Sequence, residues 1–143
     1  MQPSTADREL TVAGVALRFL AVALTLGTAY IHSTLGGLLF TLNATGYLVA
    51  AVALVVPIAL AIRFRWFIRL GLMGYALTAI VMWAIQGPYY TTAYIAKAIE
   101  VSLIIVLFVD FLRADGNPVR VVKSELALLA SKVGLRPAPA GAR

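Results

Sequence analysis

Long apolar runs, separated by short charged segments, dominate this 143-residue chain. Four such runs, each with few ionisable residues, cover approximately residues 12–31, 43–62, 70–85 and 93–112. The hydrocarbon core of a bilayer is about 30 Å thick, and a helix needs about 20 residues to cross it. Because a backbone in lipid must satisfy its own hydrogen bonds, runs of this length are expected to be helices. The predicted fold is an all-α integral membrane protein, built as a bundle of four transmembrane helices.

The composition also favours a membrane protein. Hydrophobic residues make up 62% of the chain and charged residues 13%, whereas soluble domains carry about 45–50% and about 25%. A net charge of +6 also occurs in proteins that bind nucleic acid. Here, however, the basic residues flank the apolar runs, where such residues determine membrane topology. We therefore expect the lipid bilayer as a partner, and no nucleic acid.

The distribution of basic residues predicts the orientation. Arg63, Arg65 and Arg69 lie between the second and third runs, and further basic residues follow the fourth. The segments 32–42 and 86–92 contain no Lys, Arg, Asp or Glu. Since cytoplasmic loops are enriched in Lys and Arg, both termini are predicted to be cytoplasmic. The chain is rich in Ala and Arg but has only three Lys, which favours the inner (cytoplasmic) membrane of a bacterium.

Residues 1–113 form the predicted transmembrane domain, and residues 114–143 a separate cytoplasmic segment. In that segment Asn117 and Pro118 suit the N-cap and first position of a helix, and Gly134 suits its C-terminal end. The helix is predicted to be amphipathic, and to lie on the membrane surface or to dock onto a partner subunit. The residues after it are expected to be disordered. The predicted apolar stripe recurs at spacings of three and four: Val119, Val122, Leu126, Leu129 and Val133.

Polar residues gather at the predicted outer ends of the apolar runs. Lys97 and Glu100 are three residues apart, so they share a helix face and can form an ion pair. An ionisable residue inside the membrane indicates a functional site by default, although such a pair can also serve only to fix the rotation of its helix. The candidate residues for binding a ligand or a proton are Lys97, Glu100, His32, Asn43, Tyr94 and Gln86.

His32 is the only histidine in the chain. It is expected either to form hydrogen bonds at the membrane interface or to act with Glu100 as a proton relay. The uncharged segment after it contains Gly36 and Gly37. That segment is interpreted either as an ordinary loop or as a short re-entrant piece that covers the polar residues. Pro57, late in the second run, is expected to kink or break that helix.

Several kinds of chemistry are excluded by residues that the chain lacks. It has no cysteine, which excludes disulfides, thiolate metal sites and thiol redox chemistry. One histidine cannot supply both ligands of a bis-histidine haem. The sequence contains no Walker, nucleophile-elbow or HExxH motif. We therefore expect no metal, no cofactor, and neither an ordinary hydrolase nor an ATP-driven pump.

Three functions remain open. The absence of catalytic motifs and the amphipathic helix favour a small non-catalytic subunit or scaffold, assembled with other membrane subunits or with copies of itself. The alternative is a binder or transporter of a small molecule such as a quinone, a lipid or a weak acid, with Lys97, Glu100 and His32 lining an outward-facing cavity. A membrane enzyme that uses these residues for acid–base chemistry ranks third, because no nucleophile accompanies them.

Overall fold

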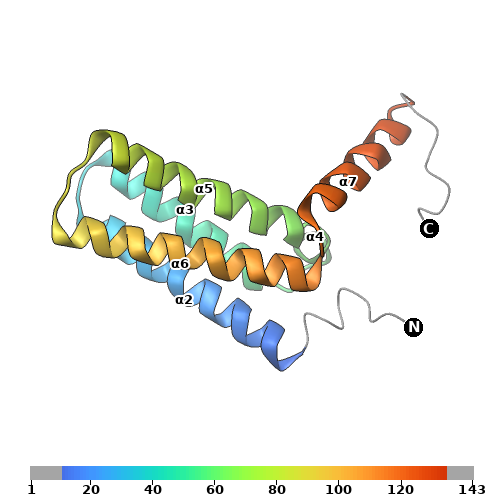
Figure 1. Ribbon diagram of the computed structural model, residues 1–143, viewed down its shortest axis with the longest axis horizontal. Coiled ribbons are helices and arrows are strands. Elements are labelled where there is room, and N and C mark those ends of the chain that lie inside the picture. Colours follow the sequence, from blue (N-terminus) through green and yellow to red (C-terminus); the bar gives the residue numbers. More distant parts are fainter. Residues whose placement is uncertain (1–10, 135–143) are drawn as a thin grey trace.

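The computed structural model describes residues 11–134, of which 86% are helical and none form strands. Four long helices are joined by short turns, and two shorter helices accompany them (Figure 1). The all-helical part of the predicted fold is therefore confirmed. The long helices are α2 (Val12–Thr34), α3 (Leu38–Val55), α5 (Arg65–Gln86) and α6 (Thr91–Ala114), and the shorter ones are α4 (Ala59–Arg63) and α7 (Pro118–Lys132).

The four long helices lie side by side. Helix α2 packs against α3 and α6, while α5 packs against α6 and, least closely, against α3. Figure 1 shows residues 35–37 and 87–90 together at one end of the four long helices, which we call the turn end. The start of α2, helix α4, the start of α5 and the end of α6 lie at the opposite end, which we call the arginine end.

The interior between the helices is narrow and is filled partly by small residues. Ala21, Ala29 and Ala76 are buried there together with Leu103 and Leu107. Large apolar side chains instead cover the outside of all four long helices, an arrangement that suits a lipid environment and not water. By length and composition, α2, α3 and α5 can each cross a membrane. The structure therefore has three candidate membrane spans among its described residues.

The second apolar run differs from the prediction at both ends. Helix α3 begins at Leu38 and not near residue 43, because Gly36 and Gly37 adopt positive φ angles of 70° and 85° and complete the turn in three residues. Residues 32–42 are therefore neither a re-entrant piece nor a loop throughout, because only residues 35–37 lie outside α2 and α3. At the other end α3 stops at Val55, and α4 starts after Pro57. The expected break at Pro57 is therefore confirmed, and it occurs because proline has no N–H to donate to the helix.

The third run begins earlier than predicted. Helix α5 starts at Arg65 and not near residue 70, so Arg65 and Arg69 belong to a helix and not to a loop. Both side chains are buried, and only 1% of Arg69 is exposed. The Arg69 guanidinium donates to Asp110 at 2.7 Å and to Asp115 at 2.8 Å, both at the end of α6. Acidic partners on the neighbouring helix therefore allow a buried arginine in the first turns of α5.

Helix α7 confirms the predicted C-terminal helix. The Asn117 side chain accepts hydrogen bonds from the backbone N–H groups of Val119 and Arg120, and Pro118 occupies the first turn. The helix extends away from the four long helices (Figure 1), and Leu126 and Leu129 in its apolar stripe are exposed. Its position on a membrane or on a partner stays a prediction. The tail predicted to be disordered lies outside the described residues.

Candidate functional site

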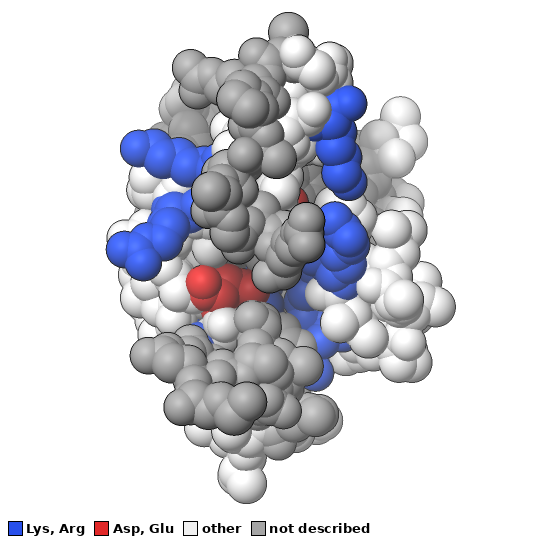
Figure 2. Space-filling view, turned by 90° about the vertical axis from the view of Figure 1, so that its right-hand side faces the viewer, with Lys and Arg blue, Asp and Glu red and all other residues white. Residues whose placement is uncertain are grey.

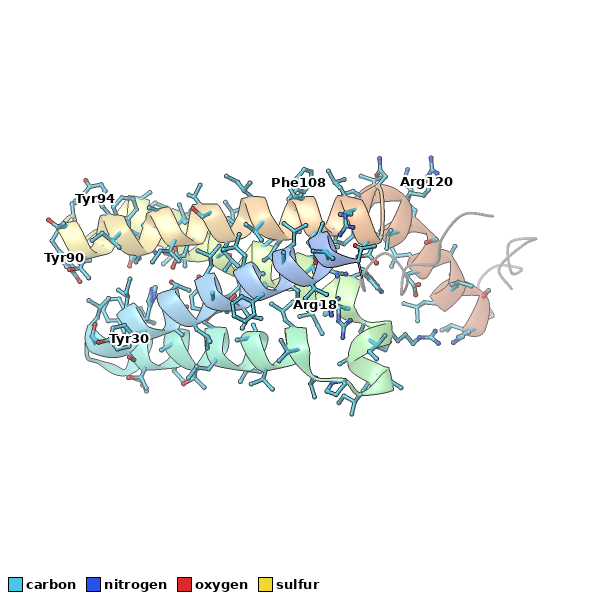
Figure 3. All side chains as sticks on the ribbon, turned by 90° about the horizontal axis from the view of Figure 1, so that it is seen from below. Arg18, Tyr30, Tyr90, Tyr94, Phe108 and Arg120 are labelled. Atoms are coloured by element: carbon cyan, nitrogen blue, oxygen red, sulfur yellow. The ribbon has the colours of Figure 1, made fainter. Side chains whose placement is uncertain are left out.

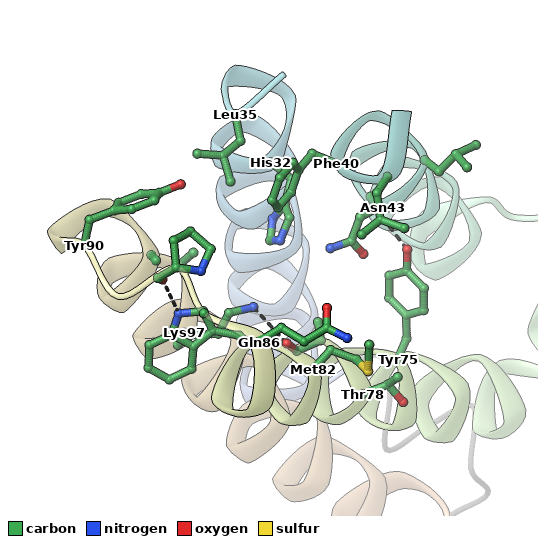
Figure 4. A pocket seen from close by; sticks show the side chains of 18 residues that line it. His32, Leu35, Phe40, Asn43, Tyr75, Thr78, Met82, Gln86, Tyr90 and Lys97 are labelled. Carbon is green, nitrogen blue, oxygen red and sulfur yellow. Dashed lines mark hydrogen bonds between the residues drawn. The ribbon is translucent and has the colours of Figure 1, made fainter. Parts of the chain in front are cut away.

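A cavity of about 370 Å³ lies at the turn end, between α2, α3, α5 and α6. Its volume falls within the range of about 300–1,000 Å³ typical of small-molecule sites. Figure 4 shows four polar side chains directed into this space, and apolar and aromatic side chains make up most of the remaining wall. The polar four are His32 from α2, Asn43 from α3, Gln86 from α5 and Lys97 from α6.

Lys97 is held in the cavity wall by an ion pair with Glu100. The Lys97 Nζ atom lies 2.7 Å from Glu100 Oε2, and it also donates to the carbonyl oxygen of Ala79 on α5 at 3.3 Å. Glu100 is completely buried, and 9% of Lys97 is exposed. The carboxylate thus lies behind the ammonium group, and of the two only Lys97 lines the cavity. An ammonium has three N–H donors, and the bonds within the described residues use two of them.

His32 lies beside the same carboxylate in a fixed orientation. Its Nδ1 atom is 2.8 Å from the backbone carbonyl oxygen of Thr28. Because a carbonyl oxygen can only accept, Nδ1 must carry a proton. The Nε2 atom then faces Glu100 Oε1 at 3.7 Å, too far for a hydrogen bond. The Thr28 hydroxyl donates to the same Oε1 at 3.1 Å, so one carboxylate is approached by groups from α2 and α6.

Tyr47 of α3 lies beside the cluster that Lys97, Glu100, His32 and Thr28 form. Its side chain is fully buried on α3, and its ring lies 5.7 Å from that of His32 between centroids. The Tyr47 hydroxyl interacts with the Glu100 carboxylate and with Thr28. The carboxylate is therefore approached from α2, α3 and α6.

Tyr75 of α5 closes the cavity on the side of α3. Its hydroxyl donates to the carbonyl oxygen of Asn43 at 3.2 Å. Gly46 permits this approach, because a Cβ atom at this position would lie only 2.5 Å from the Tyr75 hydroxyl oxygen. Nearer the turn end, Leu39 and Met82 line the cavity and are also exposed. The cavity is therefore accessible from the outer surface where α3 and α5 adjoin.

The residues predicted from the sequence are only partly brought together. His32, Asn43, Gln86 and Lys97 line the cavity, and Glu100 lies directly behind Lys97. Tyr94 does not line it. Its exposed ring instead packs edge-to-face on Trp83 at 5.0 Å.

Sequence reasoning missed Thr28 and Tyr47, both partners of this cluster. Thr28 lies four residues before His32 and so shares its helix face, which is a signal that the sequence does contain. No comparable signal identifies Tyr47, because its proximity depends on how α3 packs against α2.

A second charged cluster lies at the arginine end and was also missed. Figure 3 shows the labelled tyrosines at one end of the long helices, with Arg18 and Arg120 toward the other. Figure 2 looks onto the arginine end, where Lys and Arg side chains lie on both sides of a small acidic patch. In the interior at this end, the buried Asp110 carboxylate, inside an apolar segment of α6, accepts a hydrogen bond from Arg69. Fully buried Leu103 and Leu107 lie on α6 between Glu100 and Asp110. Apolar packing therefore separates the two charged clusters.

Within residues 11–134, no three His, Cys, Asp or Glu side chains lie together as a metal site would require. Comparison of the chain with protein-family models, with curated proteins and with solved structures gave no match. The function therefore has to be inferred from the cavity and the groups that surround it.

Proposed function

We propose that the chain crosses the membrane four times, with α6 as its fourth span beside α2, α3 and α5. Helix α6 has 24 residues, so it is about 36 Å long and exceeds the hydrocarbon core of about 30 Å. Lys97, Glu100 and Asp110 are buried against other helices and Arg113 lies in its last turn, whereas Ile105 and Phe108 on its outer side are exposed. A helix with charges inside and apolar residues outside suits a span within a bundle.

The proposed orientation places the turn end outside and the arginine end in the cytoplasm of a bacterium. It rests on the absence of charged residues at positions 35–37 and 87–90, in contrast to the arginines at the other end. Because the chain has no native cysteine, a single cysteine at Thr34 beside the turn end or at Ser124 on α7, both exposed, gives a clean test. In intact spheroplasts, a membrane-impermeant maleimide should modify the Thr34→Cys variant and not the Ser124→Cys variant. The reverse pattern would contradict the orientation.

The function that the geometry supports best is binding of a small lipophilic molecule whose head group accepts hydrogen bonds. The observation that carries this proposal is the cavity itself, in which Lys97 presents a cation with one N–H still available. The amide groups of Asn43 and Gln86 lie in the same wall and can donate further hydrogen bonds. The head group would lie against these three residues.

The remainder of the cavity suits an apolar tail. Phe40, Leu42, Met82 and Trp83 belong to its wall, and burying apolar surface against them contributes about 25 cal/mol per Å². Leu42 and Met82 are also exposed on the outer surface of α3 and α5. A lipophilic ligand could therefore enter sideways from the bilayer, without crossing the packed core.

Photolabelling tests this proposal. The protein, reconstituted in phosphatidylcholine nanodiscs, is irradiated with a long-chain carboxylic acid that carries a diazirine, with and without excess unmodified acid. The Thr78→Trp variant is designed to narrow the cavity with an indole, because Thr78 lines the exposed edge of the cavity without being packed in the core. Leu77→Trp is the matched control, since the neighbouring Leu77 is exposed and does not line the cavity.

The expected result is competable labelling of the wild type and of the Leu77→Trp variant, and at least a fivefold loss in the Thr78→Trp variant. Equal labelling of all three proteins would show that the probe reports only general contact with lipid. That outcome would refute the proposal.

A second candidate, an accessory subunit of a larger membrane assembly, is favoured by α7. Its apolar residues Leu126, Leu129 and Val133 are exposed, and it packs closely against none of the other described helices. Native mass spectrometry of the protein released from its own membranes tests this. Stoichiometric foreign subunits, lost when Leu126 is replaced by Glu and retained when Ser124 is replaced instead, would support the accessory role. A complex of this chain alone would count against it.

A further inference from the structure

We propose that the site binds a lipophilic anion and takes up one proton at His32 when it does so. This inference rests on the proposed function, and it specifies both the charge of the ligand and the regulation of its binding. The observation behind it is the pair of acceptor atoms, His32 Nε2 and Glu100 Oε1, that face each other 3.7 Å apart.

The cavity wall can gain positive charge, which suits an anion. Apart from tyrosines, the ionisable side chains that line the cavity are Lys97 and His32, and both become cations when protonated. Glu100 neutralises Lys97 from behind, at 2.7 Å. Without a ligand, the three groups therefore sum to zero while His32 is neutral. An anion at Lys97 would bring an uncompensated negative charge into an apolar environment, which is strongly unfavourable.

Protonation of His32 removes this imbalance. Its Nδ1 atom already carries a proton, because it donates to the Thr28 carbonyl oxygen. The only site for another proton is Nε2, which faces the carboxylate. A separation of 3.7 Å exceeds the usual 2.7–2.9 Å or so of a charge-assisted hydrogen bond, so the geometry matches the unprotonated state. A proton at Nε2 would form that bond and draw the two groups together.

Among residues 11–134, no other group around His32 can supply this charge. From α6 it faces Glu100 and, through that carboxylate, Lys97. From α3 it is flanked by the rings of Phe40 and Tyr47. Helix α5 adds Tyr75, which packs on Tyr47 at 4.9 Å, and its own helix α2 adds the Thr28 hydroxyl. Histidine is the one of these side chain types that usually changes charge between about pH 5 and 8.

The step conserves atoms and charge. One proton moves from water to His32 Nε2, where an N–H bond forms, and the anion enters intact from the membrane. No electron is transferred and no covalent bond of the ligand breaks. The charge of the occupied site is again zero, because the new imidazolium balances the new anion. By linkage, uptake of a proton on binding makes the affinity for the anion rise as pH falls, by at most about tenfold per pH unit for one proton.

The experiment uses a probe whose own charge does not change with pH. A diazirine-bearing long-chain alkyl sulfonate, and an uncharged alcohol of equal chain length, are each photolabelled onto the protein in phosphatidylcholine nanodiscs from pH 6 to 8. The protein carries an affinity tag without histidine, so His32 is its only histidine. We expect competable labelling by the sulfonate to increase at least fivefold from pH 8 to 6, while labelling by the alcohol stays constant. In the His32→Gln variant this pH dependence should disappear.

A direct spectroscopic measurement keeps the test independent of that variant. With ¹⁵N-labelled histidine the wild type gives a single pair of imidazole signals, and adding the non-photoreactive sulfonate at constant pH should shift them toward the imidazolium form. Competable labelling that changes less than twofold with pH, or unchanged imidazole signals in labelled protein, would overturn the proton coupling and leave ligand binding intact. No competable labelling by any probe would instead overturn the proposed function itself.

Discussion

Replacing Lys97 by Met tests how much the buried ion pair with Glu100 contributes to the free energy of unfolding. The substitution retains the length of the side chain but leaves Glu100, which is completely buried, without the ammonium group 2.7 Å away. Removing one partner of a buried ion pair is destabilising by about 3–5 kcal/mol. An ordinary hydrogen bond between membrane helices contributes only about 0.6 kcal/mol on average. We expect the ion-pair value, reduced to about 2–4 kcal/mol because Thr28 still donates to the carboxylate.

The assay is reversible unfolding of the reconstituted protein with sodium dodecyl sulfate, followed by circular dichroism. The Lys97→Met, Glu100→Gln double variant removes both charges, so its stability should return to within about 1 kcal/mol of the wild type. In the single variant His32 can replace the missing cation, because its Nε2 atom faces Glu100. The folded state then binds more protons than the unfolded chain, so the single variant should become more stable as pH falls from 8 to 6. A loss below about 0.6 kcal/mol, or a double variant no more stable than the single one, would refute this reasoning.

Two further predictions concern the wall of the cavity and the arginine end. Gly74→Ala should stabilise its helix by about 0.5–1 kcal/mol, since an added Cβ meets nothing within 4 Å. Gly46→Ala should not be stabilising and should weaken photolabelling, because its Cβ would displace the Tyr75 hydroxyl. Equal stabilisation in both variants would contradict the close approach of Tyr75 to Gly46. Asp110→Ala should reduce the free energy of unfolding by about 2–3 kcal/mol, because it removes the 2.7 Å bond to buried Arg69. Asp115→Ala should have the smaller effect, since the Asp115 side chain is 12% exposed, and the opposite ranking would refute this account of the cluster.

The sequence was sufficient to predict the helical class, the approximate positions of the long helices and the C-terminal helix. These depend on local signals, such as the Asn117 cap and the break at Pro57. The ends of α3 and α5 were predicted less well. Charged residues were assumed to end a span, but Arg69 is accommodated inside a helix because Asp110 and Asp115 come from α6. Such pairing between distant segments cannot be read from the apolar runs alone.

In the candidate site, too, the contact within one helix was predicted from the sequence and the contacts between helices were not. Lys97 and Glu100 were predicted to pair because a spacing of three residues places them on one helix face, and they do so. The contact of Glu100 with His32 and Thr28 spans two helices far apart in the sequence. It depends on the relative rotation of α2 and α6, which the sequence pattern leaves open. The cavity itself arises where α3 and α5 pack least closely, and no residue type signals that in advance.

Locating the attached photolabel is the most direct test of the central claim, that the cavity at the turn end receives a lipophilic molecule at Lys97. After irradiation of the reconstituted wild type with the diazirine-bearing carboxylic acid, the modified residues are identified by mass spectrometry of proteolytic fragments. The account predicts that competable label attaches to residues that line the cavity, such as Met82 on α5 and Leu42 on α3. Label spread over exposed residues away from the cavity, such as Phe19 and Ile105, and insensitive to competitor, would contradict it.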